Sequence, residues 1–134
     1  MKGKTYDLKK LESSGKFDTS VSARFYYNTQ DYFDDLTNFV NNYKRDLSNY
    51  TPAFVINSDE DREKFMKECF EVRADFVRLG LTALIESLEV MENAVISKKF
   101  KEFSDGQVTF KANIKICKDT INDAAMRWKM SNNR

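Results

Sequence analysis

The residues that most often perform catalysis or bind metals are sparse in this chain. Histidine, the usual acid–base group near neutral pH, is absent from all 134 residues. Its absence excludes histidine-dependent catalytic triads and histidine metal sites. The two cysteines, Cys69 and Cys117, are distant in sequence and do not make a zinc site. The sequence therefore predicts neither an enzyme nor a metal or cofactor site.

Acidic clusters are the next candidates for chemistry. One lies within residues 31–35 and another is the run 59–61. Both fall near expected helix starts, where the helix dipole favours negative charge. A Gly-rich phosphate-binding motif is absent from the sequence. We therefore interpret both clusters as solvated helix starts rather than catalytic carboxylates.

A group of lysines near the last expected helix could form a basic patch. Phe100 and Phe103 interleave with part of it, as aromatic residues do in some nucleic-acid-binding surfaces. However, 22 basic and 21 acidic residues give a net charge of +1, which argues against nucleic acid as a partner. Solvated helix faces explain the group better; it consists of Lys98, Lys99, Lys101, Lys111, Lys115 and Lys118.

Long helices must position whatever site the chain has. Only four Gly and one Pro interrupt the sequence, which suits long helices and short connections. Apolar residues recur at steps of three and four, the period of one helix face. We expect an all-α fold: an antiparallel four-helix bundle with one or two short additional N-terminal helices. The main helices are expected near residues 30–48, 59–79, 81–95 and 106–128, and the short ones near 5–14 and 19–27.

Several boundaries follow from single residues. Asn28 and Ser58 are expected to cap the helices that follow them, and Gly80 to end or bend the 59–79 helix. Pro52 is expected to disturb or end the 30–48 helix, and only residues 53–56 show a weak strand signal. We expect residues 98–105 to form a charged loop with its two phenylalanines turned inward.

The length fits one domain, residues 1–134, in which 1–17 is expected to be a loosely packed extension. Both cysteines fall within apolar helical stripes and are expected to be buried and reduced. The polar N-terminus lacks the apolar core of a signal peptide, and no run of residues is long and apolar enough to span a membrane. We therefore expect a cytoplasmic protein without a membrane partner.

The 59–79 helix carries a second set of residues away from its core stripe. Phe70, Arg73, Ala74 and Val77 are spaced by three, four and seven residues, which places them on one face. A large apolar side chain beside an arginine, off the core stripe, indicates a possible binding surface.

The segment from Phe70 to Leu84 resembles the signature of histidine-containing phosphotransfer (HPt) domains. That signature reads His-x-Leu-Lys-Gly, then five residues, Gly, and Leu four positions on. Phe70 stands where the phosphorylated histidine belongs. Residues 21–28 and 31–39 are similar to the family's segment before and into its first bundle helix. Asp61 is similar to the acidic residue with which the family's histidine-bearing helix usually starts. The other positions that match the signature are Val72, Arg73, Ala74, Gly80 and Leu84.

The departure at Phe70 matters more than the matches. In the family, the histidine accepts a phosphoryl group from a receiver-domain aspartate, a nearby Lys supports its charge and a Gly leaves room. Phe70 has no nucleophilic atom, so phosphohistidine transfer is excluded. Arg73 keeps a positive charge whose planar fork suits phosphate or carboxylate, and Ala74 keeps the surface flat.

The resemblance thus implies a non-catalytic pseudo-HPt module whose partner is a receiver domain or a histidine kinase, the module itself being a monomer or weak dimer. Two alternatives stay open. Phe70 could turn inward and widen the core, or the bundle could serve oligomerisation or ligand sensing through aromatics such as Phe25, Tyr26 and Tyr27. The expected partner-binding residues are Met66, Lys67, Phe70, Arg73, Ala74 and Val77.

Overall fold

The chain is helical throughout the part that the structure describes. The structure is a computed structural model and describes residues 2–132. Among these residues there is no strand, so the predicted all-α class is confirmed, and residues 53–56, which carried the weak strand signal, lie in a short helix. The helices are α1 (Lys2–Ser13), α2 (Val21–Phe25), α3 (Thr29–Asn42), α4 (Pro52–Asn57), α5 (Asp59–Leu79), α6 (Thr82–Ile96) and α7 (Phe100–Asn132).

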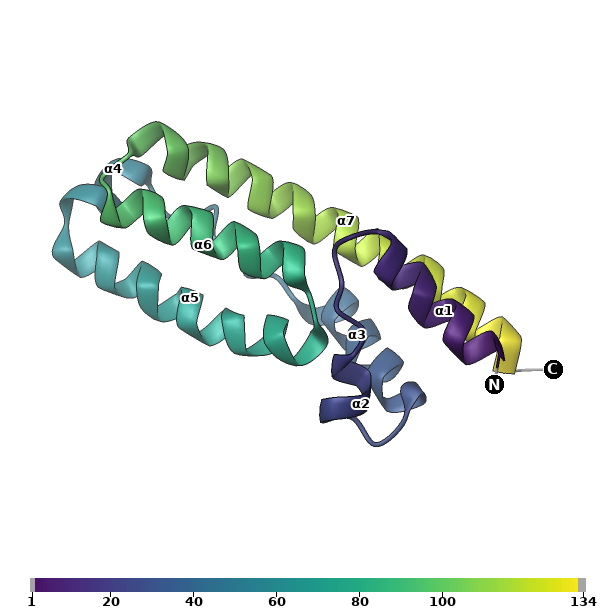
Figure 1. The fold of residues 1–134 in the computed structure, drawn as a ribbon. Coiled ribbons are helices and arrows are strands. Elements are labelled where there is room, and N and C mark those ends of the chain that lie inside the picture. The colour runs from purple at the N-terminus through teal and green to yellow at the C-terminus, as the bar shows by residue number, and fades with distance from the viewer. Residues whose placement is uncertain (1, 133–134) are drawn as a thin grey trace.

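The three C-terminal helices form the body of the molecule. Figure 1 shows α5, α6 and the first half of α7 side by side, each reversing the direction of the one before. α7 runs on beyond α6, and α1 and α3 pack against it. The short α4 lies across one end, where it contacts α5, α6 and α7. α5 thus lies at an edge of this body, with one face open to solvent.

The core consists of the apolar stripes that the sequence predicted. Phe65, Cys69, Val72, Phe76 and Leu79 of α5 are at most 1% exposed. The stripes of α3, α6 and α7 meet them, with aromatic contacts such as Phe65 against Phe103 and Phe76 against Phe110. Burying side chains of this size stabilises a fold by about 1.5–3 kcal/mol each. Because the core stripe of α5 is complete, its remaining apolar residues are left to another role.

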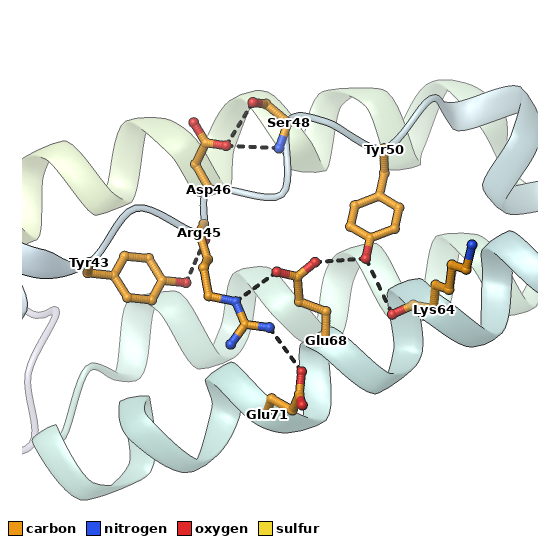
Figure 2. A network of polar contacts seen from close by, with 8 residues as sticks. All are labelled: Tyr43, Arg45, Asp46, Ser48, Tyr50, Lys64, Glu68 and Glu71. Atoms are coloured by element: carbon orange, nitrogen blue, oxygen red, sulfur yellow. Dashed lines mark hydrogen bonds and ion pairs between the residues drawn. The ribbon is translucent and has the colours of Figure 1, made fainter.

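The predicted 30–48 helix is too long, because α3 ends at Asn42 and Pro52 opens α4 instead. Residues 43–51 form an irregular segment in which Leu47 is buried at a positive φ of 60°. This segment, shown in Figure 2, is fixed by its polar groups. The Arg45 guanidinium bridges Glu68 and Glu71 of α5, and the Tyr50 hydroxyl donates to Glu68. From the other side, Gln107 of α7 donates to the carbonyls of Leu47 and Tyr50.

The predicted charged loop at 98–105 was also wrong, because α7 already begins at Phe100. Phe103 is fully buried as expected, whereas Phe100 is about half exposed. Gly106, expected to start the helix, lies inside it. A Cβ at Gly106 would lie 2.8 Å from Cγ of Met91, so this glycine allows α6 and α7 to approach closely.

Residues 8–17 take part in the same packing. Leu11 of α1 and Phe17 are buried in the core, so this portion of 1–17 is not loosely attached. Asn28 and Ser58 cap α3 and α5 as predicted, each accepting from the backbone N–H of the third residue on. Both cysteines are free and buried. Within residues 2–132, no helix is long and apolar enough to cross a bilayer.

Gly80 ends α5 and anchors the N-terminal segment. It is left-handed, with φ 72° and ψ 30°, and the N–H of Leu81 donates to the carbonyl of Phe76 in a Schellman-type end. The Gly80 carbonyl accepts from the N–H of Asp18, and a Cβ at this position would lie 2.2 Å from the Asp18 carbonyl oxygen. The second glycine of the resemblance therefore has a structural role here.

We expect Gly80→Ala to lower the free energy of unfolding by about 2 kcal/mol, through left-handed strain and overpacking against Asp18. Gly15 is a matched control, because its φ is also positive, 76°, but no atom of the described residues lies within 4 Å of its Cβ position. Gly15→Ala should cost only the strain, about 1 kcal/mol. Urea unfolding of both variants measures the difference, and equal losses would contradict the close approach.

Candidate docking surface on helix α5

The exposed face of α5 brings the predicted residues together. At about 100° per residue, Val77 lies about 20° and Ala74 about 40° around the helix from Phe70. All three are exposed. Arg73 lies about 60° away on the side toward α6, within the same arc. These residues form a shallow ridge, which we call the Phe70 face: Phe70, Ala74 and Val77, with Lys67 and Arg73 beside them.

Phe70 projects into solvent. Its exposed fraction is 75%, and that of Val77 is 44%, whereas the neighbouring Cys69 is fully buried. The interpretation in which Phe70 turns inward to widen the core is therefore wrong. Such exposure of an aromatic ring at the centre of a long helix is typical of an interface anchor rather than of a core residue.

Arg73 does not offer a free positive charge. Its guanidinium forms a forked pair with Glu92 of α6, with Nη1 donating to Oε2 at 3.2 Å and Nη2 donating to Oε1. The hydrogen bonds with Glu92 raise the pKa of Arg73. The side chains are 29% and 16% exposed, so water screens the pair only in part. The carboxylate bound by the planar guanidinium of Arg73 is thus Glu92 of the same chain.

The opposite flank of the Phe70 face is fixed by two further arginines. Arg78 of α5 donates to Asp35 of α3 at 3.0 Å and to Asp75 at 2.9 Å. Arg45 reaches Glu71, the residue after Phe70, at 2.9 Å (Figure 2). Ion pairs on both sides therefore join α5 to α6, α3 and segment 43–51, while the buried core stripe holds the helix that presents the Phe70 face.

The two remaining predicted residues differ in their surroundings. Lys67 is exposed, and among the described residues it has no ion pair. Met66 is half-buried and packs against the core, so it supports the ridge more than it extends it. Phe70, Ala74 and Val77 thus make an apolar strip, and Lys67 at its edge is a cation without an ion pair among the residues that the structure describes.

The side chains at the centre of the Phe70 face, those of Phe70, Ala74 and Val77, carry no nucleophilic or acid–base group. The thiol nearest in sequence, Cys69, is fully buried, and burial, with Glu92 nearby, raises its pKa to about 12. Such a thiol is neutral at physiological pH and is a poor nucleophile. Among the residues that the structure describes, no group of three potential metal ligands is found. The arrangement suits binding of a partner surface.

The aromatics considered for oligomerisation are divided. Tyr27 is 96% exposed and Phe25 is 54% exposed, at the end of the short α2. Tyr26 instead lies against Tyr32 and donates its hydroxyl to Asp35 at 2.6 Å. These residues do not form one continuous apolar strip on a long helix, unlike the Phe70 face.

Comparisons with protein-family models, curated proteins and solved structures found no match. The site must therefore be interpreted from its own residues. The sequence indicated the members on α5, but it did not indicate Glu92. Glu92 follows the core residue Met91, and only the packing of α6 on α5 brings it to Arg73. The sequence signal that could have indicated Glu92 is its position as an acidic residue next to the core stripe of α6.

Proposed function

We propose that this chain is a non-catalytic pseudo-HPt module that docks a receiver domain, or another two-component partner such as a histidine kinase, through the Phe70 face. The single observation that carries this proposal is the exposure of Phe70 at the position that resembles the family's phosphorylated histidine. Chemistry at that position is excluded by the side chain itself, while the apolar surface around it is retained.

The arrangement of the long helices supports the same proposal. The proposal takes α3, α5, α6 and α7 as the counterparts of the family's antiparallel four-helix bundle, with α1, α2 and α4 as additions; the packing of α6 on α5 and α7, and of α3 on α7 and α5, supports it. The helix that resembles the histidine-bearing one, α5, is well capped at Ser58 and Gly80 and has a complete core stripe. A rigid helix with an exposed aromatic centre loses little entropy when a partner docks.

The Arg73–Glu92 pair supports docking over phosphate chemistry. In the family to which the resemblance points, a cation beside the histidine supports the phosphoryl group. Here the corresponding cation is already neutralised by a partly buried carboxylate. A phosphoryl group at this face would meet Glu92 as a repelling charge, whereas an apolar partner surface would not.

Titration calorimetry of the full chain with receiver domains from the same genome, phosphorylated and unphosphorylated, tests the proposal. We expect one receiver to bind in a 1:1 complex without transfer of its phosphoryl group. Light scattering of the chain alone tests the alternative of oligomerisation. A stable dimer with no receiver binding would overturn the proposed function.

A further inference from the structure

A second surface, separate from the Phe70 face, lies between segment 43–51 and α7. It is a groove of about 730 Å³ to which α5 contributes no lining residue. Val40 and Tyr43 at the end of α3 and Ile114 of α7 provide its apolar floor. The groove exists because α3 stops at Asn42 and the chain turns away as an irregular segment, leaving the side of α7 uncovered beyond that point.

The wall of the groove is fixed in place rather than loose. The Tyr43 hydroxyl donates to the Arg45 carbonyl at 2.6 Å, and the Arg45 side chain is held by α5 (Figure 2). Asp46 accepts from the N–H and the hydroxyl of Ser48, and these hydrogen bonds hold the pKa of Asp46 below its usual range. Lys118 of α7 donates to the Tyr43 carbonyl at 2.7 Å. A preformed groove costs a ligand little ordering.

The rim of the groove is basic. Four lysines line it, against two aspartates, Asp46 and Asp119. Lys111 lies 3.8 Å from Asp46, and Lys115 lies 3.1 Å from Asp119. Among the described residues, Lys44 and Lys118 have no carboxylate within ion-pair distance. The groove therefore joins an apolar floor to an excess of positive charge, so its occupant should be apolar on one side and acidic on the other.

We propose that this groove docks an acidic amphipathic helix of a partner protein. The α7 lining runs from Val108 to Asn122, which is about 21 Å of helix and matches a partner helix of about four turns. Apolar side chains at steps of three and four would fill the floor, and flanking carboxylates would meet the four rim lysines, of which Lys44 and Lys118 are the ones not paired with Asp46 or Asp119. The two aspartates in the lining disfavour a polyphosphate backbone, which would have to approach them.

Fluorescence anisotropy with the full chain tests this inference, with three labelled probes. The first is a four-turn peptide with Leu at the i, i+3, i+4, i+7 positions and Glu on both flanks. The second has Lys in place of Glu, and the third is a DNA duplex of similar charge. We expect the Glu peptide to bind, with an affinity that falls as salt is raised, and the other two to bind at least about tenfold more weakly.

Variants locate the binding. Lys111→Glu combined with Lys115→Glu should weaken the Glu peptide at least about tenfold, because two exposed rim charges are reversed. Lys99→Glu combined with Lys101→Glu changes the charge equally at the start of α7, away from the groove lining, and should have little effect. Phe70→Ala should leave peptide binding unchanged, so that failure here is distinguishable from failure of the proposed function. No binding of the Glu peptide, tighter binding of DNA, or equal effects of the two lysine pairs would overturn the inference.

Discussion

Replacing Phe70 with Asp is expected to weaken the binding of a receiver domain about 100-fold, or about 2.7 kcal/mol. The ring is the largest exposed apolar group on α5, and central aromatic anchors commonly contribute 2 kcal/mol or more to an interface. The new carboxylate would also have to be desolvated against the partner. Because Phe70 is 75% exposed, the stability of the free chain should change little. Calorimetric titration measures the affinity, and thermal unfolding checks the fold.

Phe54→Asp is the matched control for that variant. Phe54 is also a phenylalanine, is 62% exposed and lies on the short α4 rather than on the Phe70 face. Near the start of a helix an aspartate is well tolerated. The control should leave receiver binding unchanged. If both variants weaken binding equally, or if Phe70→Asp has no effect, Phe70 is not the anchor.

Phe70→His combined with Glu92→Gln is expected to convert the docking face into a phosphoryl acceptor. The new imidazole would supply the nucleophile, and removing the Glu92 carboxylate would leave the Arg73 charge free to support the phosphoryl group. Phe70→His alone should accept phosphate poorly, because Glu92 both neutralises Arg73 and repels the incoming group. We expect the double variant to be faster by about tenfold, equivalent to about 1.4 kcal/mol. Acid-labile phosphate on the chain, followed over time with a phosphorylated receiver, measures the rate.

Glu86→Gln, combined with the same histidine, is the control for this comparison. Glu86 is exposed on α6 but lines a different hollow, beside Lys16 and Asn113, so its charge is remote from Arg73. Glutamine at position 92 can still accept a hydrogen bond from Arg73, so the double variant should remain folded. If the Glu86 and Glu92 variants accept the phosphoryl group at the same rate, the ion pair with Glu92 does not prevent Arg73 from supporting that group.

The sequence predicted the buried faces of the helices better than it predicted where the helices begin and end. Periodicity placed the core stripes of α5, α6 and α7 correctly, because burial of apolar side chains dominates helix packing. It misplaced the start of α7, since Gly106 indicated a boundary. Glycine is instead needed there because Met91 of α6 leaves no room for a Cβ at position 106. Local sequence does not reveal this contact between helices. The early end of α3 likewise depends on long-range hydrogen bonds. The Arg45 side chain donates to Glu68 of α5, and Gln107 of α7 donates to the Leu47 carbonyl.

The same division holds at the candidate site. Spacing alone predicted that Phe70, Ala74 and Val77 share a face, and they do. The state of Arg73 could not be predicted, because its partner lies 19 residues away on α6 and the pairing depends on how the two helices are set against each other. The groove beside α7 combines residues of α3, segment 43–51 and α7, and its shape follows from where α3 ends. Such features are set by packing between elements rather than by any one of them.

Docking through the Phe70 face without phosphotransfer is tested most directly by nuclear magnetic resonance. The isotope-labelled full chain is titrated with an unlabelled receiver domain, and backbone amide shifts are followed residue by residue. We expect the largest changes to centre on Phe70, Ala74 and Val77 of α5, and no phosphoryl group to appear on the chain. Shifts confined to the groove between segment 43–51 and α7, or no shifts with any receiver, would contradict it.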